Sequence, residues 1–308
     1  MSTLFSHFFE KINQISPLEH NFTEVLDSIA LKPKTLYFRG KIPENVLKND
    51  QKIRPKTVAI VGSRHNTKYG EEVAYRLAHE LGKRGAVVIS GLAYGIDSIG
   101  HRGCLDAGGV TIAVLGTPID QIYPRNHTPL AREIIEKDGA IISEYAPGAQ
   151  IYTKVSFLER NRIISGLADI VVVVEAAEKS GSLNTATHAI NQGKEVFAVP
   201  GNITNPYSQG CNKLIKQGAI PYTEPDDILR ELFHEDFAKK YHKLKQAKLF
   251  GDTDAETAIL RALAAGARSG DEIMKLSLLP PEVFNQAITL LEIKSRVRSL
   301  GMNNWGLI

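Results

Sequence analysis

The stretch Val58-Ala59-Ile60-Val61-Gly62-Ser63-Arg64 decides the fold class of this chain. Its first four residues are β-branched or small and apolar, which favours a short strand, and the strand pattern stops at Gly-Ser-Arg. From about Gly70 onward, apolar residues recur at helical spacing, as Val73, Leu77 and Leu81. The stretch therefore predicts a strand, a tight loop and a helix.

Further apolar runs of strand length follow, each with a loop of small or polar residues after it. The predicted strands are Val58–Val61, Ala86–Ile89, Thr111–Leu115, Ala140–Ile142, Ile170–Val174, Val196–Val199 and a weaker one at Ala219–Tyr222. Helical patterns such as Leu130–Lys137 and Leu183–Gln192 alternate with them, which predicts an α/β fold with a doubly wound, mostly parallel sheet. The run Ile170–Val174 has no polar alternation, so it is expected to lie centrally, covered on both faces.

Length and composition exclude several classes of protein. A chain of 308 residues with 43% hydrophobic and 23% charged residues is ordinary globular material, and its net charge of +3 permits an anionic partner without requiring one. No apolar run approaches the roughly 20 residues that span a bilayer, so a cytoplasmic protein with no membrane partner is expected. Cys104 and Cys211 are expected to be reduced thiols outside any metal-ligand motif.

The chain divides into four predicted segments. Residues 1–54 are a lead-in, with a short amphipathic helix and then an edge strand within Pro33–Gly40, while residues 55–233 carry the alternation of strands and helices. Residues 234–252 are a lysine-rich linker, interpreted as solvated, with a contribution to anion binding as the alternative. The amphipathic helix is predicted from the spacing of Phe5, Phe8, Phe9 and Ile12.

Residues 253–308 predict a small winged-helix module of three helices and a hairpin. Such modules bind duplex DNA or serve as protein contacts. The expected recognition helix, near Glu282–Glu292, has acidic residues at both ends and no basic residue before Lys294. This composition disfavours DNA reading by the module.

Small residues recur in the loops after the predicted strands. Glycines let a phosphate approach backbone N–H groups, and helix N-termini add partial positive charge, so the shared sheet edge is expected to hold phosphate. The alternative is that each glycine merely turns the chain. A dinucleotide fingerprint and a Walker loop are both absent from the sequence. The loops are Gly62–Arg64, Ser90–Asp97, Gly116–Pro118, Ser143–Tyr145, Ser180–Leu183 and Pro200–Asn202.

A basic and aromatic cluster precedes the central strand, with Lys154, Phe157, Arg160, Asn161 and Arg162. Cations interleaved with a ring suit single-stranded nucleic acid, whose phosphates need neutralising and whose bases need a platform. Two alternatives stay open: the arginines pair with local carboxylates such as Glu159 and Glu175, and the ring of Phe157 is simply buried. Lone histidines such as His101 form no catalytic set, which favours binding over chemistry, with an Arg/Glu nucleotide hydrolase as the rival.

At these residues the chain resembles the DNA processing protein A family (DprA, also called Smf). The motifs that carry the resemblance are Val61-Gly62-Ser63-Arg64, Ser90-Gly91-Leu92-Ala93-Tyr94-Gly95-Ile96-Asp97, Tyr123-Pro124, Ser143-Glu144-Tyr145, Arg160-Asn161-Arg162, Ser180-Gly181-Ser182 and Val199-Pro200-Gly201. The resemblance implies an extended Rossmann fold that binds single-stranded DNA, forms homodimers and loads RecA recombinase during natural transformation. It also implies that Arg64 and Lys154 contact phosphates.

The sequence is therefore interpreted as a non-enzymatic recombination mediator without a cofactor. The expected single-stranded DNA site comprises Gly62, Ser63, Arg64, Gly91, Lys154, Phe157, Arg160, Asn161, Arg162, Ser180, Gly181 and Ser182. The rival enzyme is a phosphoribohydrolase, which would carry a Pro-Gly-Gly-x-Gly-Thr loop where this chain has Pro200-Gly201-Asn202. A third interpretation is a winged-helix transcription factor. It would need a basic recognition helix, which the sequence does not have.

Overall fold

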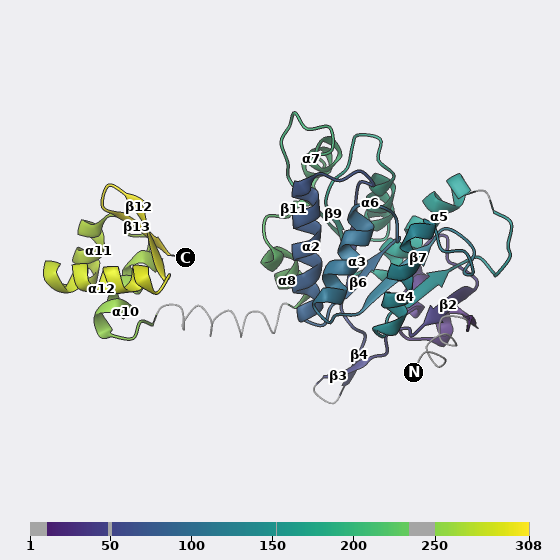
Figure 1. Ribbon diagram of the computed structural model, residues 1–308, viewed down its shortest axis with the longest axis horizontal. Helices are drawn as coiled ribbons and strands as arrows, with labels where there is room; N and C mark the ends of the chain where they lie inside the picture. Colours follow the sequence, from purple (N-terminus) through teal and green to yellow (C-terminus); the bar gives the residue numbers. More distant parts are fainter. Residues whose placement is uncertain (1–10, 49–50, 152, 234–249, 308) are drawn as a thin grey trace. The chain divides into compact units, whose positions relative to one another are not determined.

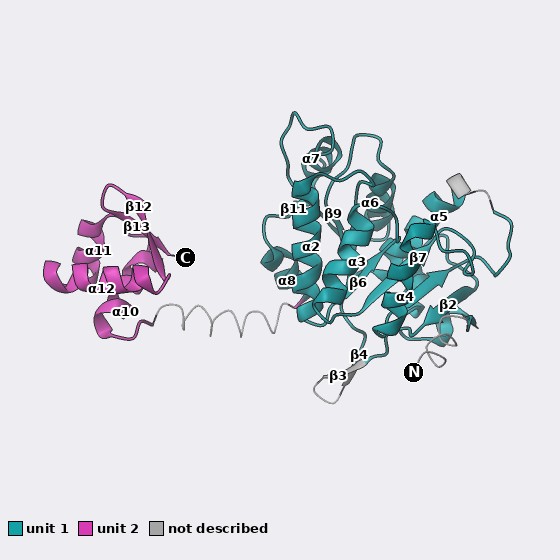
Figure 2. Ribbon diagram, in the orientation of Figure 1, with its two compact units in different colours: residues 1–232 teal, residues 233–308 magenta. Residues whose placement is uncertain are grey.

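The chain divides into two units, Met1–Leu232 and Phe233–Ile308 (Figure 2). The structure is a computed structural model that describes residues 11–48, 51–151, 153–233 and 250–307. Most of the predicted N-terminal amphipathic helix and of the lysine-rich linker lies outside the described residues. Within the described ranges, no helix combines the length and the apolar run needed to cross a bilayer.

A nine-stranded sheet in the order β1-β2-β8-β7-β6-β5-β9-β10-β11 forms the centre of the first unit (Figure 1). Each neighbouring pair in the run β8-β7-β6-β5-β9-β10-β11 is parallel. This arrangement confirms the predicted fold class. β9 lies inside the sheet between β5 and β10 and is fully buried, as the apolar run predicts. The parallel strands are β5 Thr57–Val61, β6 Val87–Ser90, β7 Thr111–Leu115, β8 Ala140–Ser143, β9 Ile170–Val173, β10 Glu195–Ala198 and β11 Ile220–Pro221.

Helices cover both faces of this sheet (Figure 1). Along β7, Ile112 and Val114 pack into the core shared with α5, whereas Ala113 and Leu115 pack into the core shared with α4. This alternation follows from the two-residue period of a strand and produces the doubly wound arrangement. The helices are α2 Lys68–Lys83, α3 Ile96–Asp106, α4 Thr128–Glu136, α5 Thr153–Leu167, α6 Gly181–Asn191, α7 Gln209–Lys216 and α8 Pro225–Leu232, with the 3-10 helix η3 Arg125–His127 before α4.

The N-terminal segment extends the sheet. β2 Leu36–Gly40 pairs antiparallel with β8, and β1 Asn13–Ile15 pairs antiparallel with β2. The prediction of an edge strand within Pro33–Gly40 is therefore wrong about its position, because β1 lies outside it. A three-residue strand is too short to show a periodic pattern in the sequence. The segment also contains η1 Pro17–Glu19, η2 Glu24–Ser28 and the hairpin of β3 Val46–Lys48 and β4 Gln51–Ile53.

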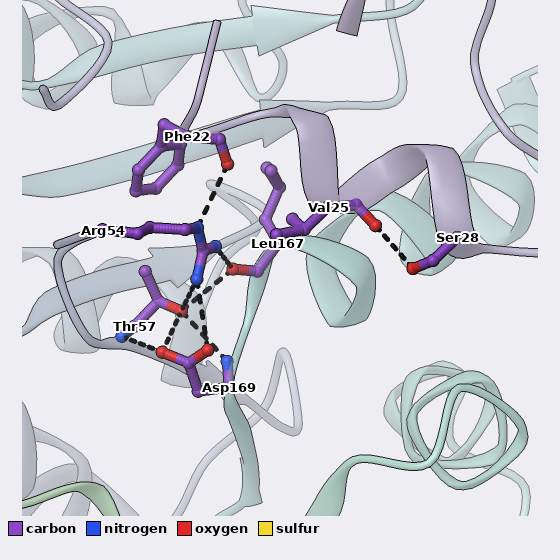
Figure 3. A network of polar contacts seen from close by, with 7 residues as sticks. All are labelled: Phe22, Val25, Ser28, Arg54, Thr57, Leu167 and Asp169. Atoms are coloured by element: carbon purple, nitrogen blue, oxygen red, sulfur yellow. Dashed lines mark hydrogen bonds and ion pairs between the residues drawn. The ribbon is translucent and has the colours of Figure 1, made fainter. Parts of the chain in front are cut away.

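Arg54 ties this segment to the parallel sheet (Figure 3). Its guanidinium donates to the carbonyl oxygens of Phe22, at 3.2 Å, and Leu167. It also donates to Asp169 Oδ1 at 3.1 Å, and its Cζ lies 4.8 Å from the centroid of the Phe22 ring. Asp169 in turn accepts from the backbone N–H of Thr57 at 2.8 Å. One guanidinium therefore joins the lead-in to the starts of β5 and β9.

Within residues 250–307, the second unit has three helices and a two-stranded sheet, as predicted for a winged helix. They are α10 Asp254–Ala264, α11 Gly270–Ser277, α12 Pro281–Ile293, β12 Val297–Gly301 and β13 Asn304–Leu307. The side chains of Thr253 and Ser269 cap α10 and α11 by accepting from backbone N–H groups. The core of the unit includes Ile259, Leu263, Phe284, Leu291 and Val297, all buried.

Candidate nucleic-acid interface

A pocket of about 400 Å³ opens where β5 and β9 end. It is lined by the loop after β5, the start of α3, one face of α5 and the N-terminus of α6. The pocket brings together most of the predicted site residues: Gly62, Ser63, Arg64, Phe157, Arg160, Asn161, Ser180, Gly181 and Ser182. Gly91 and Arg162 are not among its lining residues.

Backbone hydrogen bonds hold the loop after β5 from two sides. The Ser63 backbone N–H donates to the carbonyl oxygen of Glu175 at 2.7 Å, and the Ser63 carbonyl accepts from the Ile96 N–H at 3.1 Å. A Cβ at Gly62 would lie 2.7 Å from the Ile96 side chain, so glycine is required for this close approach. Arg64 is exposed, and its guanidinium has no hydrogen-bond partner among the residues that the structure describes.

One face of α5 forms a wall of the pocket. Phe157, Arg160, Asn161 and Ile164 all line it, and their spacing of three, four and seven positions places them on the same side of a helix. Arg162 lies two positions after Arg160, which turns it about 200° around the helix axis. The helical period therefore separates two arginines that are close neighbours in the sequence.

Arg160 forms the floor of the pocket. The residue is 5% exposed, and its guanidinium donates to the carbonyl oxygens of Gly91, at 2.9 Å, and Val114. Burial lowers the pKa of Arg160 to about 10, against the opposing effect of Asp97. Burial likewise raises the pKa of Asp97, against the effect of Arg160 and of backbone N–H groups that include that of Gly91. This arginine supplies positive potential from beneath the pocket.

Gly91 packs against the Arg160 guanidinium and is not among the residues that line the pocket. A Cβ at this position would lie 2.4 Å from a guanidinium nitrogen of Arg160. The glycine therefore makes room for the buried cation, and its carbonyl oxygen accepts a hydrogen bond from it; its predicted contact with single-stranded DNA stays a prediction.

The N-terminus of α6 faces the same pocket. The Ser180 hydroxyl caps the helix by accepting from the Ser182 N–H at 3.3 Å, and the two hydroxyls lie 2.7 Å apart. The Asn161 side chain donates to the Gly181 carbonyl oxygen at 3.3 Å, which joins α5 to this helix end. Gly181 itself is exposed, with open space where a Cβ would be. An eleven-residue helix with this orientation adds partial positive charge to the pocket.

Arg162 is not among the residues that line the pocket, and its predicted contact with single-stranded DNA stays a prediction. It makes a two-pronged ion pair with Glu144, both oxygens at 2.8 Å, and donates to the Leu31 carbonyl oxygen at 2.7 Å. Pairing with a local carboxylate, one of the two alternatives left open, therefore applies to Arg162, with Glu144 as the partner. Glu175 instead accepts from the Thr67 hydroxyl at 2.6 Å. The Lys154 side chain lies outside the described residues, so its predicted role stays a prediction.

The ring of Phe157 is half-buried and adjoins two further groups. The Arg64 Cζ lies 5.6 Å from its centroid, and the Tyr123 ring lies 5.4 Å away at an interplanar angle of 41°. Tyr123, in the loop after β7, is 49% exposed. The site prediction omitted Tyr123, although the Tyr123-Pro124 pair already belongs to the motifs of the resemblance. The ring contact with Phe157 is visible only in the fold.

The winged-helix unit presents few free cations on its expected recognition helix. Lys294, which follows α12, donates to Asp252 and to the buried Glu256, each at 2.7 Å. The exposed side of α12 carries Val283, Leu290 and Ile293. No cluster of three or more potential metal ligands occurs in the described part of either unit.

The fold and the pocket define a class of protein: a doubly wound α/β domain with a basic, aromatic-lined pocket at its sheet edge, followed by a winged-helix unit. A family model described as DNA recombination-mediator protein A matches residues 13–233, and one described as DprA winged helix domain matches residues 244–301. The chain belongs to the DNA recombination-mediator protein A family, which confirms the resemblance found in the sequence.

Curated relatives and solved structures agree with this assignment. Protein Smf of Escherichia coli is 42% identical over 240 residues, which are 76% of this chain and 63% of that protein, so the chain spans less than two thirds of this relative. DNA processing protein DprA of Bacillus subtilis is 41% identical over 72% of this chain and 71% of its own length. The structure of DNA processing protein A from Helicobacter pylori, described in terms of its single-stranded DNA binding mode, matches with a TM-score of 0.63 and 32% identity over 75% of this chain and 98% of that chain.

Proposed function

We propose that this protein is a non-enzymatic recombination mediator that binds single-stranded DNA in the pocket at the end of β5 and β9. The observation that carries the proposal is Arg64, an exposed guanidinium without a hydrogen-bond partner among the described residues, at the edge of a pocket that also receives the N-terminus of α6. Phosphate is the anion that such a combination of guanidinium and helix N-terminus binds well. The Helicobacter pylori relative, whose structure concerns single-stranded DNA binding, supports the choice of ligand.

The proposed ligand is a single strand because the pocket is bordered by rings. Phe157 and Tyr123 place two rings together here. An aromatic ring stacks only on a base whose face is open, and a duplex hides those faces. In the proposed site, Gly62, Ser63, Arg64, Ser180, Gly181 and Ser182 surround the phosphates, Arg160 and Asn161 support them from below, and Lys154 adds a further phosphate contact. Membership of a recombination-mediator family extends the proposal to loading of RecA recombinase, to action as a homodimer in the cytoplasm and to natural transformation.

The rival hydrolase would need an acid or base free to act in the pocket. The Asp97 carboxylate accepts from the Gly91 N–H at 3.0 Å, and Glu175 accepts from the N–H and the hydroxyl of Thr67. Both carboxylates thus serve the loops that shape the pocket, which supports binding over chemistry.

The decisive experiment is fluorescence anisotropy with labelled oligothymidylate, duplex DNA and a mononucleotide across a salt series. Arg64→Ala is expected to weaken single-strand binding and to reduce the slope of log affinity against log salt by about 0.7, the value for one phosphate contact on a single strand. Arg84→Ala is the matched control, because this exposed arginine lies at the opposite end of α2 from the pocket.

Equal slopes for wild type, Arg64→Ala and Arg84→Ala would remove Arg64 from the site. Equal affinity of the wild-type protein for single strands and duplexes, or turnover of the mononucleotide that Arg64→Ala abolishes, would overturn the proposal in favour of the hydrolase.

A further inference from the structure

The surroundings of Phe157 limit what its ring can do. A Cβ at Gly116 would lie 2.5 Å from a ring carbon of Phe157, so the ring packs against the backbone at the end of β7. The Arg64 guanidinium lies over the ring at 5.6 Å, that of Arg160 at 6.0 Å, and the Tyr123 ring is 5.4 Å away. Backbone, two cations and a second ring therefore already surround Phe157, which leaves it little open surface for a base.

Tyr123 has the open surface that Phe157 lacks. Its side chain is 49% exposed, and its hydroxyl has no hydrogen-bond partner among the described residues. Of the other exposed tyrosines described in this unit, Tyr69 donates to the Pro200 carbonyl oxygen and Tyr75 donates to Asp106, each at 3.0 Å. Tyr94 packs its ring against His127, which does not line the pocket. Tyr123 instead contacts the rest of the unit through its ring, which lies against that of Phe157, a residue that lines the pocket.

We infer that Tyr123 is the base-stacking residue of the site, and that Phe157 positions Tyr123 and Arg64 beside each other. The inference rests on the proposed single-stranded DNA site and adds to it the place where a base binds. Arg64, which would bind a phosphate, and Tyr123, which would stack on a base, both contact the ring of Phe157. Stacking does not depend on hydrogen bonds to the base edge, so Tyr123 serves every base.

The test compares oligothymidylate with an abasic oligonucleotide of equal length, which has the same phosphates and no bases. Wild type is expected to bind the oligothymidylate roughly tenfold more tightly, within the range measured for stacking of one base on an aromatic side chain. Tyr123→Leu is expected to remove that preference while leaving the abasic affinity and the salt slope unchanged. Tyr123→Phe keeps the ring and is expected to keep the preference. Tyr75→Leu, which removes a 39% exposed tyrosine on α2, is the matched control.

The outcomes separate this inference from the proposed function. If Tyr123→Leu keeps the full preference for oligothymidylate, the base does not stack on Tyr123, although single-strand binding stands. If Tyr123→Leu weakens abasic binding as much as oligothymidylate binding, Tyr123 only supports the loop and the inference is wrong. If wild type binds neither oligonucleotide, the proposed function itself fails. Thermal unfolding of each variant confirms that the compared proteins are folded.

Discussion

Arg54→Met is expected to destabilise the first unit strongly, because it removes a guanidinium that joins the N-terminal segment to the starts of β5 and β9 (Figure 3). Hydrogen bonds that involve a charged group contribute about 1.5–3 kcal/mol each, and breaking a fully buried ion pair costs about 3–5 kcal/mol. The Arg54 and Asp169 side chains are 17% and 31% exposed, so water replaces part of the loss. The expected decrease in the free energy of unfolding is therefore about 2–4 kcal/mol.

The assay is equilibrium unfolding in denaturant, with a thermal melt beside it. For a unit of this size the expected loss lowers the melting temperature by roughly 5–15 °C. Lys32→Met is the control, since it removes the Lys32 pair with Asp27, whose side chains are 58% and 43% exposed. Such a surface pair contributes only about 0–1 kcal/mol. A decrease for Arg54→Met no larger than that for Lys32→Met would refute the reasoning.

Three further outcomes are expected. Burial lowers the pKa of His101 to about 3, so the free energy of unfolding should fall as the pH drops from 6.5 toward 3, and His101→Gln should remove that part of the pH dependence in denaturant titrations at several pH values. Gly91→Ala should cost about 1–3 kcal/mol by displacing Arg160, whereas Gly181→Ala, where a Cβ meets open space, should be nearly neutral in the same unfolding assay. Deletion of residues 253–308 should leave single-strand affinity in anisotropy titrations nearly unchanged, and a large loss would transfer the DNA site to the winged-helix unit.

The parallel sheet could be predicted from the sequence because its signals are local. Each strand is a short apolar run, each pocket loop begins where such a run stops, and the run Ile170–Val174 shows its burial by lacking polar residues. The three helices and hairpin of the second unit were predictable for the same reason, since caps such as Ser269 and the start at Pro281 lie beside the apolar pattern that they delimit.

Two kinds of feature were not predicted from the sequence: the side of a helix to which a side chain points, and contacts between residues that are distant in the sequence. Arg160 and Arg162 look equivalent in the sequence, but they point to different sides of α5. Arg160 lies at the pocket floor, and Arg162 pairs with Glu144. Helical periodicity applied within residues 157–164 would have separated them. The contact between Tyr123 and Phe157 joins the loop after β7 to helix α5 through the fold, and no local pattern could have revealed it.

The two ends of the nine-stranded sheet bear on the solubility of the folded chain. An edge strand exposes unpaired N–H and C=O groups that can recruit a strand from another molecule, and long edges of this kind promote aggregation. Here β1 at one end has three residues, and β11 at the other has two, one of them Pro221, which has no N–H to donate. A broad, apolar sheet therefore ends on each side in a strand too short to template the addition of another chain, and concentrated protein should resist fibril formation for as long as β1 and β11 stay in place.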